Sequence, residues 1–69
     1  MTKSMKERLY NYCIHEMKNV TKHGHDPNET CARCYGAVMF LLDMYGWDEE
    51  VAKMWDDEIH PKFCELGAI

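Results

Sequence analysis

The chain has 69 residues, and its eight basic and twelve acidic side chains give a formal net charge of −4. This length suits a single small domain over residues 1–69 and excludes a dinucleotide fold or a lidded substrate cleft. The acidic balance argues against general nucleic-acid binding, which needs basic side chains to replace counterions. We expect no membrane association and a cytoplasmic location, because no apolar run reaches roughly 18 residues and no signal-peptide core begins the chain.

The first helix is predicted from apolar side chains that recur at spacings of three or four residues. They are Met5, Leu9, Tyr12, Cys13, Met17 and Val20. This spacing places them on one face of an amphipathic helix. The pattern fades after Thr21, and Gly24 offers a C-terminal stop because glycine readily adopts the left-handed backbone of a helix end.

The second helix has the clearest start signal in the chain. Asp26 can cap it, Pro27 suits the first helical position, and a glutamate follows three residues after the cap. We expect a helix from about Pro27 to Tyr45. Its centre, residues 37–42, is apolar on every side, which predicts a helix covered by two neighbours. Gly36 lowers helix stability, so we expect a close approach of another backbone there.

A third helix is predicted after Gly46, with Asp48 as its cap. It should continue through Ile59 and stop or kink at that point, because Pro61 has no backbone N–H and clashes with the preceding turn. The apolar side chains among residues 63–67 predict a final turn that folds back on the helices.

The connections between these segments are tight, at residues 24–26 and 46–48. Short connections imply antiparallel neighbours, and no alternating strand pattern occurs. The sequence therefore predicts an all-α fold, an antiparallel three-helix bundle with a short C-terminal helical turn.

Four potential metal ligands should lie at one end of this bundle. Counting about fifteen residues back and forward from Gly46 brings Cys31 and Cys34 level with His60 and Cys64. Zinc takes four nitrogen or sulfur ligands in a tetrahedral arrangement. One hypothesis is thus a zinc-stabilised domain; the others are that these cysteines only pack, or that they form a disulfide. We expect no other cofactor.

The same cysteine pair has the C-x-x-C spacing of dithiol oxidoreductases. Activation of such a pair needs a thiolate at a helix N-terminus, whereas Asp26 and Glu29 lie nearby and Cys31 falls in the second helical turn. No other part of the chain assembles a nucleophile, a base and an orienting group. We expect a protein that is not an enzyme.

The charge is unevenly distributed along the chain. Residues 1–22 carry five basic and two acidic side chains, whereas residues 43–69 carry two basic and eight acidic ones. One hypothesis is a docking surface for a basic partner or an acidic mimic of a nucleic-acid backbone, and the other is a solvated face partly neutralised by the first helix. The candidate partner-binding carboxylates are Asp48, Glu49, Glu50, Asp56, Asp57 and Glu58.

Aromatic and methionine side chains exceed what a bundle of this size needs to fill its centre. Two tryptophans, four tyrosines, two phenylalanines and six methionines occur in the chain, and methionine suits adaptable surfaces. Some of them should be exposed and could pair two chains as a homodimer. The leading functional hypothesis is a small protein-interaction or accessory module that uses the acidic helix face and exposed aromatic side chains.

Two segments carry a likeness to other sequences: residues 34–40, CYGAVMF, and residues 54–63, MWDDEIHPKF. The aromatic-Gly-Ala helix and the Trp-acid…Pro-Lys-Phe ending resemble short uncharacterised bacterial and phage-type helical proteins. The resemblance implies a small helical protein of unknown function from mobile or accessory genes, and it transfers no catalytic residue.

Overall fold

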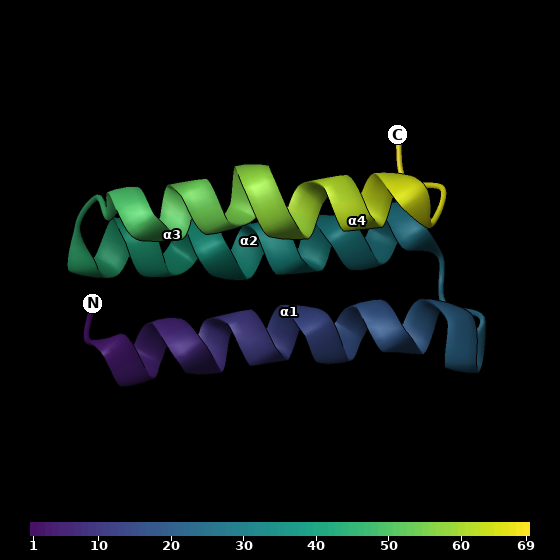
Figure 1. Ribbon diagram of the computed structural model, residues 1–69, viewed down its shortest axis with the longest axis horizontal. Coiled ribbons are helices and arrows are strands. Elements are labelled where there is room, and N and C mark those ends of the chain that lie inside the picture. The colour runs from purple at the N-terminus through teal and green to yellow at the C-terminus, as the bar shows by residue number, and fades with distance from the viewer.

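Three helical rods pack antiparallel in the computed structural model, which describes residues 1–69 (Figure 1). The second rod packs most extensively against the first, and it also contacts the last segment of the third. No strand is present, so the predicted all-α three-helix bundle is confirmed. The first rod is α1 (Lys3–His23) and the second is α2 (Pro27–Tyr45). The third rod consists of α3 (Glu49–Met54), the π-helical turn η1 (Trp55–Ile59) and α4 (His60–Glu65), which follow one another without a break.

The helix ends follow the capping chemistry that the sequence predicts. The Asp26 carboxylate accepts hydrogen bonds from the backbone N–H groups of Asn28, at 2.8 Å, and Glu29, at 3.2 Å. These bonds satisfy donors that the first helical turn leaves free. Gly24 closes α1 with φ 68°, in the left-handed region that favours glycine.

The disturbance predicted near His60 is a π-helical turn, and the third rod does not stop at Pro61. It passes through η1 and continues as α4 to Glu65. In η1 the N–H of His60 donates to the carbonyl of Trp55, one residue further back than in an α-helix. Because the wider π turn immediately precedes Pro61, the proline ring avoids the carbonyl with which it would clash in a regular α-helix.

The same π turn keeps the apolar stripe of the third rod facing the core. Val51, Trp55, Ile59 and Phe63 are all buried and are spaced four residues apart. In an α-helix each such step rotates the side chain by about 40°, so the stripe would drift by about 120° over its length. A π turn accommodates one extra residue, which holds the four side chains nearly in line.

The core runs along the axis between the three rods. Leu9, Cys13 and Met17 enter it from α1, while Cys34, Val38 and Leu42 enter it from α2. Ile59 and Phe63 are the largest fully buried side chains, and the remaining members are Val51 and Trp55.

Two rods flank α2, as predicted, but one side of the helix stays uncovered, and the close backbone approach expected at Gly36 is not found. Met39 and Phe40 are 42% and 62% exposed, so the apolar centre of α2 is not buried on every side. A β-carbon built on Gly36 would meet no atom within 4 Å, so no backbone of this chain approaches the glycine. The physical reason is that two neighbouring rods cover only two sides of a helix, and the third side of α2 faces outward.

Candidate functional site

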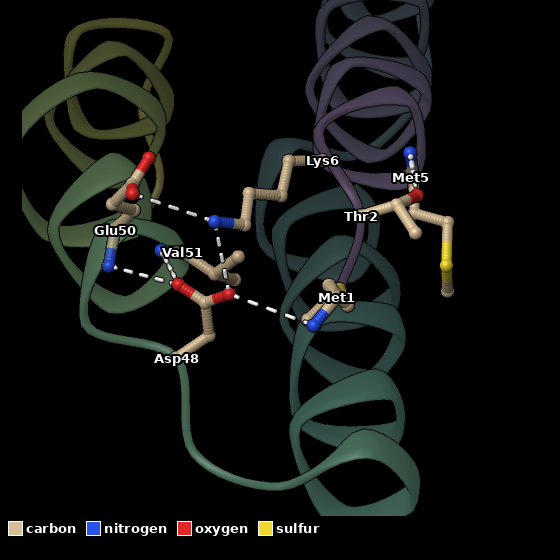
Figure 2. Close-up of polar contacts among 7 residues, drawn as sticks. All are labelled: Met1, Thr2, Met5, Lys6, Asp48, Glu50 and Val51. Atoms are coloured by element: carbon tan, nitrogen blue, oxygen red, sulfur yellow. Dashed lines mark hydrogen bonds and ion pairs between the residues drawn. The ribbon is translucent and has the colours of Figure 1, made fainter.

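Asp48 lies at the start of α3 and links the third rod to α1 (Figure 2). One carboxylate oxygen, Oδ1, accepts hydrogen bonds from the N–H groups of Glu50 and Val51, at 3.0 and 3.3 Å. The other, Oδ2, lies 3.1 Å from Lys6 Nζ and 3.8 Å from the amino group of Met1. A single carboxylate therefore caps α3 and pairs with Lys6 of α1 and with the amino group of Met1, which precedes α1.

These contacts change the protonation equilibria of Asp48 and Lys6. Partial desolvation of Asp48 opposes ionisation, but the hydrogen bonds from Lys6, Val51 and Glu50 outweigh it, and the pKa of Asp48 is lowered. The hydrogen bond to Asp48 raises the pKa of Lys6. Glu50 adds a carboxylate 3.5 Å from Lys6 Nζ. Two of the six predicted partner-binding carboxylates are thus engaged by α1.

Glu49 is occupied by an aromatic neighbour. The indole Nε1–H of Trp47 donates to Glu49 Oε2 at 3.1 Å. The Trp47 ring is 69% exposed and follows Gly46 in the connection between α2 and α3. This contact fixes a large apolar ring at the surface beside a carboxylate.

The other three predicted carboxylates, Asp56, Asp57 and Glu58, are successive residues of η1. All three are exposed and none takes part in an ion pair. Successive helical residues point in different directions, so the carboxylates spread around the turn and do not form a flat row. Glu58 lines a shallow hollow between α1 and α3 that also includes Lys3 and Glu7.

An aromatic cluster surrounds Trp55, the first residue of η1. The buried ring of Trp55 has its centroid 5.3 Å from that of Tyr35, 6.0 Å from that of His60 and 6.4 Å from that of Phe63. Tyr35 and His60 are themselves exposed. Sequence reasoning missed this cluster, because it considered His60 as a metal ligand. The available signal was that Trp55 and Phe63 both belong to the four-residue apolar spacing of the third rod.

The four predicted zinc ligands divide into two groups. Cys34 is fully buried against Cys13 of α1, whereas Cys64 is exposed with its Sγ 3.7 Å from Nε2 of His60. Cys31 is half-buried and near enough to Cys64 to be influenced by its charge. All four cysteines are free. No group of three or more histidine, cysteine, aspartate or glutamate side chains is arranged to hold a metal ion.

Neither cysteine of the C-x-x-C pair has an environment that favours ionisation of its thiol. The contact with Cys13, together with burial, raises the pKa of the Cys34 thiol. Burial raises the pKa of Cys31, and the neighbouring Cys64 and Cys13 add to the effect. Reactive dithiols need the opposite shift, so the environment of this pair disfavours the redox hypothesis.

The exposed side of α2 is a second surface that sequence reasoning did not identify as such. A shallow hollow there is lined by Gly36, Met39, Phe40, Leu42, Asp43 and Trp47. The apolar run of residues 37–42 was interpreted as a helix covered by two neighbours, and the excess of aromatic and methionine side chains predicted only that some of them would be exposed. The available signal was Gly36, because a glycine in the middle of a helix lowers its stability and is typical of a place where another group approaches closely.

Comparison with protein-family models, with curated proteins and with solved structures finds no match to this chain. The resemblance to short bacterial and phage-type proteins therefore stays a prediction. No helix has both the length and the apolar character needed to cross a membrane.

Proposed function

We propose that this chain is a non-catalytic protein-interaction module that binds a basic partner through the carboxylates of η1. The observation that carries the proposal is the contrast among the acidic side chains of the third rod. Asp48 and Glu50 are paired with Lys6, whereas Asp56, Asp57 and Glu58 are exposed and unpaired. Three adjacent charges that contribute no ion pair within the chain are available to an external cation.

The surroundings of η1 support a partner of protein chemistry. Tyr35 and His60 are exposed, and their rings lie against that of Trp55, the first residue of η1. Such a mixed surface offers aromatic contact and hydrogen-bond acceptors together, and it suits lysine or arginine side chains, whose cationic groups also stack on aromatic rings.

A cytosolic setting belongs to the same proposal. All four cysteines are unpaired, and thiols stay reduced in the cytosol. Binding there would be governed by charge, so it would weaken as ionic strength rises and screens the carboxylates.

The proposal is tested by titrating a ¹⁵N-labelled sample with a synthetic oligolysine peptide and following the amide resonances. We expect shifts centred on residues 55–60 that diminish with added salt. The variant carrying Asp56→Asn, Asp57→Asn and Glu58→Gln should lose this response. Proteins captured from a lysate by the wild type should be lost in parallel by the same variant.

A matched control removes the same number of charges elsewhere. Asp26→Asn, Glu29→Gln and Glu65→Gln lower the negative charge equally, and asparagine still caps a helix at residue 26. This control should bind like the wild type. Shifts centred away from η1, or equal losses in both variants, would contradict the proposal, because net charge alone would then explain binding.

A second candidate is a zinc-stabilised domain, and the approach of Cys64 Sγ to His60 Nε2 at 3.7 Å favours it. Cys31 would supply a third ligand, whereas Cys34 would first have to leave its buried contact with Cys13. Cobalt titration checks this candidate through the absorption bands of thiolate ligation, and a Cys64→Ser variant should abolish them. Absence of these bands and an unfolding temperature unaffected by zinc or chelator would eliminate it.

A further inference from the structure

The outer face of α2, formed by Arg33, Gly36, Phe40 and Asp43, has no partner within the chain. The spacings of three, four and three residues place these four side chains on one side of the helix. Phe40 is 62% exposed, and the hollow beside it is lined by Gly36 and Asp43. A bulky ring thus stands next to a depression on the same helix.

Gly36 supplies the depression. It lies in the middle of a 19-residue helix at a position where an added β-carbon would meet nothing within 4 Å. Its backbone conformation is helical, so no turn requires glycine there. Glycine weakens a helix interior, and its common structural use in such a place is close contact with another group. No group of this chain makes such a contact at Gly36.

The arrangement of the four residues is symmetric about Val38. Gly36 and Phe40 lie two residues on either side of it, and Arg33 and Asp43 lie five residues on either side. If a second α2 runs antiparallel with its Val38 at the same level, each residue meets its counterpart across the contact. Phe40 then faces Gly36 of the other copy, and Arg33 faces Asp43, about 7.5 Å along the axis from the centre.

This reciprocity is the requirement for a twofold contact, in which residue i of one copy meets j of the other and j meets i. The charges of Arg33 and Asp43 also favour an antiparallel over a parallel orientation of the two α2 helices. Asp43 is exposed and has no ion pair within the chain, and Arg33 is 48% exposed with only a 3.9 Å approach to Glu16. A parallel pair would place arginine against arginine and aspartate against aspartate, which is unfavourable.

We propose that the outer face of α2 binds a second copy of this chain in an antiparallel twofold dimer. In it, Phe40 of each chain occupies the depression at Gly36 of the other, and Arg33 pairs with the partner's Asp43. The proposal is independent of the basic partner assigned to η1, because Asp56, Asp57 and Glu58 belong to the third rod and take no part in the outer face of α2.

Sedimentation equilibrium over a range of protein concentrations measures the dimer directly. We expect Phe40→Ser to weaken dimerisation by roughly tenfold or more, as truncation of a central aromatic residue does in other interfaces. Tyr45→Ser is the matched control, since Tyr45 is also exposed on α2 but points away from Phe40. It should leave the dimer intact, and circular dichroism checks that both variants remain folded.

A charge exchange tests the direction of pairing. Arg33→Asp alone and Asp43→Arg alone should each weaken the dimer, because each brings like charges together. The double variant carrying both changes should recover dimerisation, since the exchanged charges again face each other across an antiparallel contact. Gly36→Ala should raise the unfolding temperature of the monomer while weakening the dimer.

Two results would overturn the proposal. One is a monomer mass at every concentration reached. The other is a dimer that is insensitive to Phe40→Ser and is not recovered by the double charge exchange, since a different face would then form the contact. Neither result would affect peptide binding at η1, so the two proposals fail separately.

Discussion

At the scale of single residues, the main departure from an ideal core is Thr30. Its side chain is almost fully buried in α2, yet its hydroxyl oxygen has no hydrogen-bond partner. Burying an unsatisfied hydroxyl costs free energy that an apolar group of the same shape would not. The buried thiols of Cys13 and Cys34 differ in this respect, because each meets the other across the contact between α1 and α2.

Replacing Thr30 by valine should therefore stabilise the protein. Valine keeps the branched shape and removes the hydroxyl, so Thr30→Val should raise the free energy of unfolding by about 1 kcal/mol in urea denaturation. Thr21→Val provides the comparison, since the exposed Thr21 hydroxyl donates to the carbonyl of Lys18. That change should give no gain. A loss of stability in Thr30→Val would show that the hydroxyl is satisfied in solution.

At the scale of elements, the π turn joins two helical segments that a proline would otherwise interrupt. It keeps Val51 and Phe63 on the same side of the rod, and it lets Pro61 follow without a clash between its ring and the preceding turn. Deleting one residue of η1 would restore α-helical periodicity, because eleven residues make almost three whole turns. The apolar stripe would stay in line, but Pro61 would enter a regular helix interior.

The two roles of η1 can be separated by experiment. Deletion of Asp57 alone should lower the free energy of unfolding, because the proline then clashes with the turn before it. Deletion of Asp57 together with Pro61→Ala should recover about 3 kcal/mol relative to the single deletion. Urea denaturation of the two variants measures this difference. Equal stabilities would mean that the π turn does not serve to accommodate the proline.

At the scale of the whole molecule, the rods at the two ends of the chain are joined by charge. Lys6 and the amino group of Met1 converge on Asp48, so α1 is held against the start of the third rod (Figure 2). The C-terminus is attached elsewhere, through a 2.8 Å hydrogen bond from the N–H of Ile69 to Asn28 Oδ1. The two ends of the chain thus secure opposite ends of the bundle (Figure 1).

The contact between Asp48 and Lys6 should make stability depend on pH in a defined direction. The pKa of Asp48 is lowered on folding from 3.8, so its contribution is present above that value and is lost as pH falls through the folded pKa. The pKa of Lys6 is raised from 10.5, so its contribution is present below that value and is lost at higher pH. Asp48→Asn should destabilise the protein near neutrality.

The difference between wild type and Asp48→Asn should disappear in acid well below pH 3.8, where the wild-type carboxyl is protonated. Asparagine retains the helix cap, so Asp48→Ala should be the less stable of the two variants at every pH. Urea denaturation at several pH values measures both effects. A constant difference between wild type and Asp48→Asn across the whole range would exclude the ion pair as its cause.

The helix boundaries and the bundle were predictable because they depend on local chemistry. Asp26, Pro27 and Gly24 define helix ends through their own side chains and backbone preferences. The π turn was not predictable from Pro61 alone. It follows from comparing the four-residue spacing of the buried stripe with the 3.6-residue helical period, which requires knowing which residues are buried.

The candidate sites were predictable only as residue types. The sequence places Asp48 among the acidic residues, but only the packing of α1 brings Lys6 to it. Likewise, Cys34 turns toward Cys13, and not toward Cys64, because its position on α2 faces α1. Phe40 was expected in the core because its neighbours in sequence are apolar, and its exposure depends on how many rods surround α2.

The short connections between the rods also have a kinetic consequence. Each helix follows its neighbour after only a few residues, at Gly24 and at Gly46. Most of the packing therefore joins segments that are close in sequence, and chains of this kind fold rapidly because little entropy is lost in closing loops. The contact of Lys6 with Asp48 joins residues that are 42 positions apart in the chain. We expect it to form late, after the second and third rods have paired.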